Sequence, residues 1–400
     1  MGHQTHHVEP EEPRVDCEGD GEKTTLWYFI GALAVGGAER TLVDLVNNVD
    51  RDRYDVTIWT MFDDNRLAPD VDPAVPIRTL GMKNARDSDT FVGGATNPLD
   101  YVRVPLRFVR AVRRERPDVV QSFLFLDNTV ARIAGLVSPE TVVVTGARGL
   151  QNRTNPFVKA VDRLLIPLSD YIVSNSTSGA ETYVERGADP DRVDVVHNGR
   201  NLDAFVEAEP APLREEFDVP AGAPLVGMVS RLVPKKGQVD LVDAWPRVRA
   251  SHPDAHLVLV GDGAEREALA AQAASLGVAD SVHFAGNRDD VPEVLAALDV
   301  FVFTSYSEGL SGALLEAMAA GRPIVATGIV ENRELVTDGE TATLVPTHAP
   351  DAVARAVVDL LDDPTRAATL GRAAQRDAVD RFSLERMVGN FEAFYESILD

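Results

Sequence analysis

Residues 300–320 read VFVFTSYSEGLSGALLEAMAA and show the structural unit from which the chain is built. The segment 300–304 is almost entirely apolar, as expected for a strand that is buried on both faces of a sheet. A glycine-containing loop follows, and residues 312–320 then have the composition of a buried helix. A short strand, a loop and a helix in this order predict one βα unit of a parallel sheet.

The same alternation of apolar strands and helical segments continues on both sides of this unit. In the second half of the chain, further strands are predicted at 225–229, 256–260, 282–284, 324–326 and 342–345. In the first half, strands are predicted at 26–30, 56–60, 119–124, 141–145, 171–174 and 193–197. The chain therefore has the pattern of two Rossmann-like α/β halves, whose ligands bind beyond the carboxyl ends of the strands.

The domain boundaries follow from length and composition. A chain of 400 residues is expected to form two or three domains. Residues 206–223 are rich in proline, alanine and acidic side chains, so they are the predicted linker between an N-terminal domain at 24–205 and a C-terminal domain at 224–380. Residues 1–23 predict a disordered acidic tail. Residues 381–400 predict an amphipathic helix that could cross back to the N-terminal domain.

The charge balance is strongly acidic. The chain has 39 Lys and Arg against 63 Asp and Glu, a formal net charge of −24 at pH 7. Binding to nucleic acid needs a basic surface, so no nucleic-acid partner is expected. Only five of the basic residues are lysines. We therefore hypothesise a salt-adapted protein from a halophilic archaeon, since molar salt shortens the Debye length to about 3 Å. The alternative is an acidic protein from a GC-rich bacterium.

The sequence also predicts where the protein resides. It contains no apolar run of the roughly 18 residues that a membrane-spanning helix needs. The N-terminal segment lacks the apolar region of a secretory signal. The single cysteine, Cys17, cannot form an internal disulfide. These features predict the reducing cytoplasm.

Two loops in the second half of the chain contain the residues whose types most clearly indicate a binding site. The segment 230–237, SRLVPKKG, follows a predicted strand and contains two of the five lysines beside Arg231. Arginine and lysine donate charge-assisted hydrogen bonds to phosphate, so an anion site is predicted, with a solvated loop as the alternative. Glu308 lies in the loop after strand 300–304, and Glu316 falls inside the next helix. A carboxylate among apolar residues needs hydrogen-bond donors, and sugar hydroxyls are suitable ones.

A glycine pair in the first half marks a second candidate loop. Gly36 and Gly37 follow the first strand and precede a helix that opens at residues 38–40. Glycines let a backbone approach a ligand closely, and helix N-terminal amides favour anions. The loop lacks the G-x-G-x-x-G pattern of dinucleotide-binding proteins. A tight strand-to-helix turn explains the pair equally well.

Taken together, these motifs resemble glycosyltransferase family four, the retaining GT-B enzymes that use nucleotide-diphosphate sugars. The resemblance spans residues 26–399 and rests on an ordered series in both halves. The series comprises Gly36-Gly37-Ala38-Glu39, His197-Asn198-Gly199, Ser230-Arg231 with Lys236-Gly237, Val260-Gly261-Asp262-Gly263, Phe284-Ala285-Gly286, and the E-x7-E pair of Glu308 and Glu316. It implies a GT-B type α/β fold, in which two Rossmann-like domains face each other across a cleft.

The resemblance also implies roles for the donor-site residues. Arg231 and Lys236 would hold the donor diphosphate and stabilise the leaving group, Glu316 would bind the ribose hydroxyls, and Glu308 would contact the transferred sugar. Arg231, Lys236 and Glu308 are thus the predicted catalytic residues. Three backbone amides are expected near the sugar and phosphate, those of Gly309, Leu310 and Ser311. Fixed cations can stabilise the departing diphosphate, so neither a metal nor a further cofactor is expected.

The acceptor side departs from the family pattern. Many members carry a histidine in the segment that corresponds to residues 120–128, but Leu126 occupies that position here. Its neighbour Asp127 is the candidate replacement. Arg148 follows another predicted strand and is a candidate for the cleft, with a surface role as the alternative. With Gly36, Gly37 and Glu39, these residues make up the predicted acceptor side.

A basic segment stands out in this acidic chain. Residues 101–116, YVRVPLRFVRAVRRER, contain six arginines and one glutamate. On a helical wheel, Arg103, Arg107, Arg110 and Arg114 fall within a sector of about 60°, opposite an apolar side. Such a helix could contact an anionic membrane surface peripherally. The alternative is a solvated face whose arginines pair with local acids.

The leading prediction is a retaining, metal-independent, hexosyltransferase-like enzyme. It would move a sugar from a nucleotide-diphosphate donor to a glycan or lipid-linked acceptor, in the synthesis of glycans, surface polysaccharide or glycolipid. A GT-B nucleotide-sugar epimerase is one alternative, and it would interconvert donors without an acceptor. A catalytically degenerate nucleotide-sugar-binding protein is another, and the missing histidine keeps it open.

Overall fold

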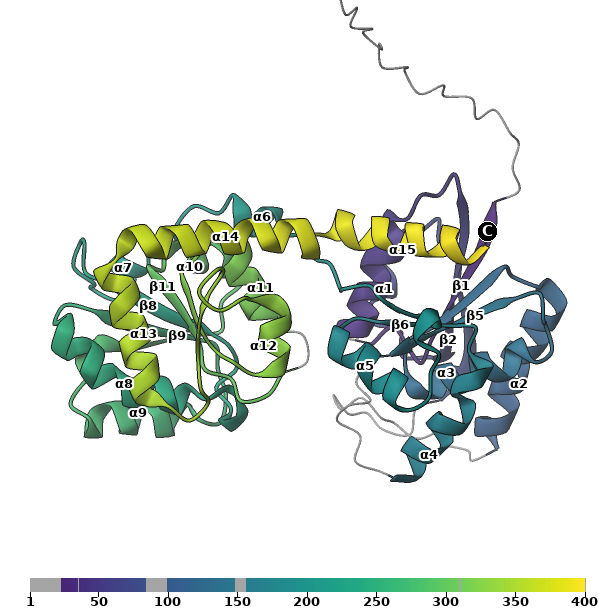
Figure 1. The fold of residues 1–400 in the computed structure, drawn as a ribbon, viewed down its shortest axis with the longest axis horizontal. Helices are drawn as coiled ribbons and strands as arrows, with labels where there is room; N and C mark the ends of the chain where they lie inside the picture. Colours follow the sequence, from purple (N-terminus) through teal and green to yellow (C-terminus); the bar gives the residue numbers. More distant parts are fainter. Residues whose placement is uncertain (1–22, 35, 84–98, 148–155, 309–310, 400) are drawn as a thin grey trace, which may run out of the picture.

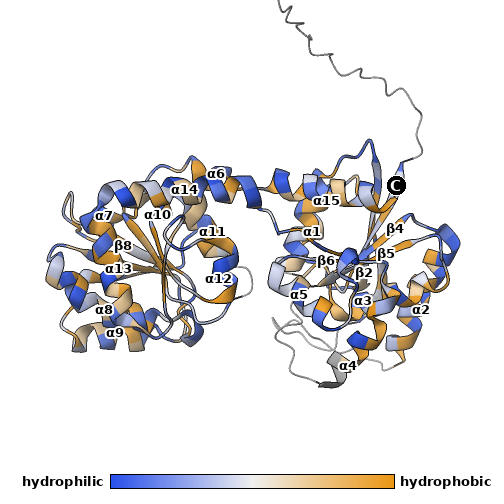
Figure 2. Ribbon diagram, in the orientation of Figure 1, coloured by the Kyte–Doolittle hydropathy of each residue, from blue (hydrophilic) through white to orange (hydrophobic). Residues whose placement is uncertain are grey.

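The computed structural model describes residues 23–34, 36–83, 99–147, 156–308 and 311–399. Its strands form two separate parallel sheets, one of seven strands and one of six, each packed against helices (Figure 1). The sheets lie in two lobes, and a long helical segment bridges them along one side. Hydrophobic residues concentrate in the strands, as Figure 2 shows, so each lobe is built around its own sheet.

The first lobe contains the seven-stranded sheet, in the order β3-β2-β1-β4-β5-β6-β7. Its strands are β1 (Thr24–Ile30), β2 (Tyr54–Phe62), β3 (Ile77–Met82), β4 (Val119–Ser122), β5 (Val142–Ala147), β6 (Tyr171–Ser174) and β7 (Val193–Val195). Its helices are α1 (Gly37–Asn48), α2 (Asp100–Glu115), α3 (Phe125–Gly135), α4 (Pro156–Leu165) and α5 (Thr177–Glu185), with 3-10 turns η1 (Ala68–Asp70), η2 (Ile166–Leu168) and η3 (Pro190–Arg192). In the register of the sheet, Leu26 pairs with Val56 on one side and with Val119 on the other.

The second lobe contains the six-stranded sheet, in the order β10-β9-β8-β11-β12-β13. Its strands are β8 (Leu225–Val229), β9 (His256–Val260), β10 (Val282–Gly286), β11 (Val300–Phe303), β12 (Ile324–Thr327) and β13 (Thr343–Val345). Its helices are α8 (Gln238–Ser251), α9 (Arg266–Ser275), α10 (Val291–Ala297), α11 (Gly312–Ala319), α12 (Val330–Leu335), α13 (Pro350–Asp362) and α14 (Pro364–Phe382), with 3-10 turns η4 (Pro234–Lys236) and η5 (Ala279–Ser281). Because β8 and β11 are parallel neighbours, the loops that follow them leave the sheet side by side.

Two connections pass between the lobes, and their backbones touch. The first follows β7 and leads into the short helix α6 (Asp203–Val206), and the second joins α14 to α15 (Leu384–Leu399). The Arg200 amide donates to the Phe382 carbonyl over 3.0 Å. A side chain at Gly199 would collide with the backbone of Ser383, so this close approach requires a glycine.

Helix α15 packs into the core of the first lobe. The Tyr395 hydroxyl lies 3.0 Å from that of Tyr28 and donates to Oε1 of Gln121 over 2.6 Å. Met387 and Phe391 are buried in the same apolar cluster. The chain thus returns to its first sheet after completing the second.

Three segments differ from the sequence prediction. Strand β3 was not expected, because it is an edge strand whose exposed positions interrupt the apolar run. Helix α12 was not expected either, since its six residues are too few to show a helical period. The segment 206–223 contains helix α7 (Leu213–Glu216), and Leu213 and Val219 are buried in the core of the second lobe. Its composition indicates an irregular backbone but does not reveal this packing.

No helix in the part of the chain that the structure describes has both the length and the apolar character needed to span a membrane.

Candidate functional site

The loops after β8 and β11 meet at the carboxyl edge of the second sheet. The Tyr306 amide donates to the Lys235 carbonyl over 2.8 Å, and the Thr304 hydroxyl donates to the Lys236 carbonyl over 3.3 Å. Gly237 has a φ of +69°, and a side chain there would collide with the Thr304 carbonyl. A glycine is therefore required where the two loops cross. These contacts fix turn η4, which carries both lysines.

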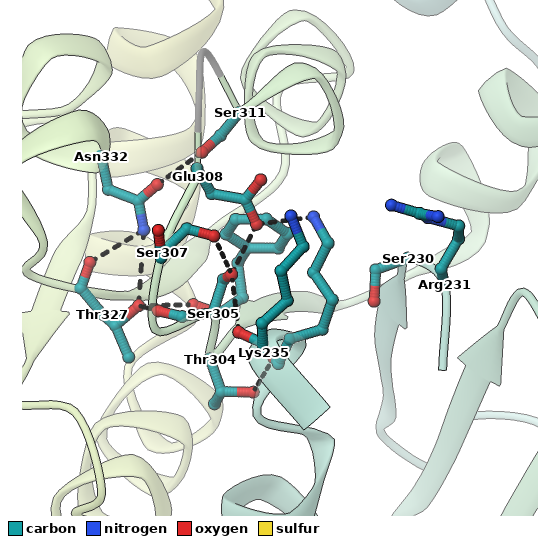
Figure 3. Close-up of polar contacts among 12 residues, drawn as sticks. Ser230, Arg231, Lys235, Thr304, Ser305, Ser307, Glu308, Ser311, Thr327 and Asn332 are labelled. Atoms are coloured by element: carbon teal, nitrogen blue, oxygen red, sulfur yellow. Dashed lines mark hydrogen bonds and ion pairs between the residues drawn. The ribbon is translucent and has the colours of Figure 1, made fainter. Parts of the chain in front are cut away.

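Lys236 and Glu308 form an ion pair at this crossing. The Lys236 ammonium lies 2.5 Å from Oε1 of Glu308, and the two side chains are only 14% and 7% exposed. The Ser305 hydroxyl donates to the same oxygen over 2.5 Å (Figure 3). A buried charge is tolerated when it is paired and hydrogen-bonded, as this carboxylate is. The sequence placed both residues at strand ends but did not predict their direct contact.

Arg231 lies at the end of β8, beside the lysine turn (Figure 3). Its side chain is exposed and forms no ion pair with any described residue. The buried Gln238 holds the loop, because its amide donates to the Ser230 hydroxyl and to the Arg231 carbonyl, each over 2.8 Å. Gln238 was not identified from the sequence, since a glutamine that opens a helix carries no recognisable signal.

A hydrogen bond to α12 fixes the start of α11. The Ser311 hydroxyl donates to Oδ1 of Asn332 over 2.7 Å, and the Asn332 amide donates to the Thr327 carbonyl over 2.9 Å (Figure 3). Asn332 is fully buried. The predicted site residues Gly309 and Leu310 lie outside the described residues.

Glu316 lies on α11, and its hydrogen-bond donor is an arginine. Oε1 of Glu316 accepts from Nη1 of Arg200 over 2.6 Å, and the Glu316 side chain is 18% exposed. Burial raises the pKa of the Glu316 carboxyl, and the positive charge of Arg200 offsets part of that rise. The need for a donor was predicted from the apolar surroundings. Arg200 was not, because 116 residues separate the two in sequence.

Gly36 and Glu39 lie together at the start of α1 in the first lobe. Glu39 is buried in the first helical turn, where a negative charge is favourable. A side chain at Gly36 would collide with the Glu39 carboxylate, so the glycine leaves room for it. Among the described residues, no neighbouring atom lies within 4 Å of the point where a Gly37 side chain would begin.

Asp127 occupies the carboxyl edge of the first sheet. It is buried in the first turn of α3, and a side chain added at Gly31, just after β1, would lie 3.6 Å from its Oδ1. The adjacent Leu126 is partly buried and packs against an apolar core cluster of the first lobe. Asn128 fixes this turn, since its amide donates to the Gly146 carbonyl over 2.9 Å. Asp127 thus lies at this sheet edge, next to the position that corresponds to the family histidine, whereas Arg148 lies outside the described residues.

No group of three or more His, Cys, Asp or Glu side chains among the described residues is arranged to hold a metal ion.

Comparison with known sequences finds two family matches. The family described as "Glycosyltransferase Family 4" matches residues 35–204, and "Glycosyl transferases group 1" matches residues 223–363. The lipopolysaccharide core biosynthesis glycosyltransferase LpsE of Rhizobium meliloti is 30% identical over 353 residues, which covers 88% of this chain and 93% of that protein.

Comparison with solved structures agrees in fold. Anabaena Alr3699/HepE in complex with UDP superposes with a TM-score of 0.75 at 23% identity, covering 94% of this chain and all of that one. Its complex with UDP-glucose superposes with a TM-score of 0.69 at 22% identity, covering 93% of this chain and 99% of that one. The predicted GT-B architecture, with two Rossmann-like domains, is therefore confirmed.

Proposed function

Because the chain belongs to the glycosyltransferases of group 1 and family 4, we propose that it transfers a sugar from a nucleotide-diphosphate sugar to an acceptor hydroxyl, with retention of configuration. The observation that carries this proposal is the Lys236–Glu308 ion pair beside Arg231, at the carboxyl edge of β8 and β11. A cationic edge that also carries a buried carboxylate suits a ligand with both phosphates and hydroxyls.

In this proposal the diphosphate binds between Arg231 and Lys236. An ammonium has three donors, so Lys236 can keep its ion pair with Glu308 and still donate a hydrogen bond to a phosphate oxygen. As the glycosidic bond breaks, negative charge grows on the departing diphosphate, and these fixed cations stabilise it. No step of this scheme requires a metal ion.

Glu308 is proposed to accept hydrogen bonds from the hydroxyls of the transferred sugar. Ser305 and Lys236 fix its carboxylate in place. The departing phosphate oxygen would take the proton of the acceptor hydroxyl as the new glycosidic bond forms. The acceptor would approach from the first lobe, where Asp127 and the Gly36-Gly37 loop are its proposed contacts.

The acceptor is proposed to be a glycan or a lipid-linked glycan. Two observations support this class. The relative LpsE is named for lipopolysaccharide core synthesis. In addition, α2 and the preceding Leu99 expose apolar side chains, those of Leu99, Val102 and Leu106, together with arginines, a surface suited to an anionic membrane. We propose that the protein works in the cytoplasm and contacts the membrane peripherally through this helix.

Nucleotide binding and product stereochemistry test the proposed reaction. A thermal-shift screen with UDP, GDP, ADP and their sugars should identify one base, because a ligand that binds only the folded state raises the melting temperature. With that donor and a mixture of glycan acceptors, nucleoside diphosphate should be released and an α-linked donor should give an α-linked product by NMR.

Other outcomes separate the alternatives. Inversion at the anomeric carbon would exclude the retaining mode. Interconversion of donors without acceptor would identify an epimerase, and binding without release would identify a degenerate member.

A further inference from the structure

Arg200 lies where the two connections between the lobes touch, at residues 199–200 and 382–383, which we call the hinge, and its side chain reaches the helix that carries Glu316. Its backbone is anchored at the hinge, because its amide donates to the Phe382 carbonyl over 3.0 Å and the chain there pairs with Ser383 of the second connection. Figure 1 shows where this second connection lies, between α14 and α15. The Arg200 side chain extends from this anchor to α11 of the second lobe.

The guanidinium fits against the first turn of α11. Nη1 donates to Oε1 of Glu316 over 2.6 Å, and a side chain added at Gly312 would lie 3.0 Å from Nη2. Gly312 therefore leaves the space that the guanidinium occupies. The arrangement involves a glycine, a carboxylate and an arginine from two segments, so it is more than a chance surface pair.

The contact leaves Glu316 able to bind a ligand. Among the described residues, Arg200 is the hydrogen-bond donor to this carboxylate, and it engages Oε1 alone. An ionised carboxylate has about four acceptor positions. Oε2, and part of Oε1, can therefore still accept from hydroxyl groups.

The charge of Arg200 also acts on a carboxylate of the first lobe. Burial raises the pKa of Asp44 on α1, and the charges of Arg40 and Arg200 each lower it in part. The charged groups that act on this site are therefore Asp44 and Arg40 from α1, Arg200 from the hinge and Glu316 from α11. Within this set, the Arg200 guanidinium is the one in hydrogen-bond contact with Glu316.

We propose that Arg200 is a positioning residue of the donor site, which fixes the Glu316 carboxylate so that its remaining acceptor positions receive the vicinal hydroxyls of the donor ribose. This inference rests on the proposed function and extends it to a residue outside the E-x7-E element. Arg200 would touch neither sugar nor phosphate. It acts through Glu316 and thereby links recognition of the ribose to the hinge.

The test uses the full chain and separates ribose recognition from phosphate binding. Affinities of wild type, Arg200→Ala, Arg200→Lys and Glu316→Gln are measured by calorimetry for the nucleoside diphosphate that the screen identifies, for its 2′,3′-dideoxy analogue and for inorganic pyrophosphate. The control is Arg247→Ala, which removes an exposed ion pair with Asp351. Melting curves verify that each variant is folded, and Arg200→Lys retains a charge at the site if Arg200→Ala does not fold.

Wild type and Arg247→Ala should prefer the ribonucleotide over its dideoxy analogue by about tenfold or more, the scale of a hydrogen bond to a charged group. Arg200→Ala and Glu316→Gln should lose most of that preference, while pyrophosphate binding stays within about twofold of wild type. The lysine variant should fall between them, because an ammonium is a point charge without the planar fork.

The pH dependence of ribonucleotide affinity is a second measurement. A purely structural role of Arg200 would leave this pH dependence unchanged. Ribonucleotide affinity should fall in acid as Glu316 becomes protonated, and this fall should begin at higher pH in Arg200→Ala, where burial acts unopposed. Glu316→Gln should show no such fall. If wild type distinguishes ribose and Arg200→Ala does so equally at every pH, the positioning role is overturned. If wild type binds none of the nucleotides, the proposed function itself fails.

Discussion

Lys236, Ser305 and Glu308 form a single charged unit at the residue scale. The ammonium and the hydroxyl share one carboxylate oxygen, so a change to any of them alters the other two. Glu308→Gln keeps the shape but removes the charge, and Lys236→Ala removes the cation that would face the leaving diphosphate. Either change should lower turnover by about a hundredfold or more, as the loss of preorganised electrostatics does.

This prediction is measured as release of nucleoside diphosphate, with a melting curve for each variant. Arg247→Ala serves as the control, because its ion pair is exposed and lies away from this edge. If turnover is unchanged in both site variants, the assignment of Lys236 and Glu308 to the donor site is wrong.

A substitution of Asp127 tests the proposed acceptor side, again at the scale of single residues. Asp127 is buried near the end of β1, and Leu126 is partly buried against an apolar cluster of the same lobe. Asp127→Asn should lower turnover while leaving nucleotide affinity unchanged, because the nucleotide is bound by the other lobe. Leu126→Met, a volume-conserving change, should leave turnover within a fewfold of wild type. Equal turnover in Asp127→Asn and wild type would exclude a role for this carboxylate.

At the scale of elements, α2 keeps the amphipathic division that its sequence predicts, because Val104, Phe108, Val109 and Val112 are buried whereas the arginines of the predicted sector are exposed. The structure differs at Val102, which falls on the apolar side of the helical wheel but is 61% exposed, and Arg107 from the arginine sector donates to the Leu80 carbonyl over 3.1 Å. The exposed surface therefore combines Val102, Leu106 and Leu99, which directly precedes α2, with Arg103 and Arg110. Among the described residues, no acidic side chain forms an ion pair with either of these two arginines.

This face predicts binding to anionic membranes. At low salt the protein should co-sediment with phosphatidylglycerol vesicles, and Arg103→Glu with Arg110→Glu should reduce the bound fraction several-fold, since each basic residue contributes about 1 kcal/mol near such a surface. Charge reversal at Arg247 should have little effect. An absence of wild-type binding at low salt would refute the membrane contact.

A pair of histidines makes the β9–β10 edge sensitive to acid. Nδ1 of His256 lies 2.8 Å from Nε2 of His283, and burial lowers the pKa of both imidazoles, with the charge of Arg249 adding to the shift at His256. These two histidines therefore bind protons less readily in the folded state than in the unfolded chain. As a result, the free energy of unfolding decreases as pH falls through the ordinary histidine range. His283→Phe should flatten the fall in melting temperature between pH 7 and pH 5. A slope equal to that of wild type would contradict this origin.

The sequence predicts elements best where burial is complete. Strands such as β8 and β11 are buried on both faces, so an uninterrupted apolar run marks them. Edge strand β3 and the six-residue α12 leave weaker patterns, and both were missed. At the candidate site, strand ends and charged residues could be predicted from the sequence, which is why Arg231, Lys236 and Glu308 are candidates, and their roles stay predictions. Arg200, Gln238 and Asn332 were missed because their roles depend on contacts that only the folded chain creates.

At the scale of the whole molecule, the net charge of −24 is the dominant property. Repulsion between surface carboxylates opposes the compact state, and salt screens it, with a Debye length of about 10 Å at 0.1 M and about 3 Å at 1 M. If the surface is adapted to molar salt, the urea midpoint should rise markedly between 0.1 M and 2 M KCl. Equal stability at both concentrations would favour the alternative of an ordinary acidic bacterial protein.

Helix α15 has a consequence for the order in which the lobes are completed during synthesis. Tyr395 completes a hydrogen-bonded group with Tyr28, although 367 residues separate them in sequence. While the ribosome is still translating the second lobe, the first sheet lacks Met387, Phe391 and Tyr395 from its core. The lobe that is made first is therefore finished last, and a nascent chain must keep that apolar surface from aggregating until α15 emerges.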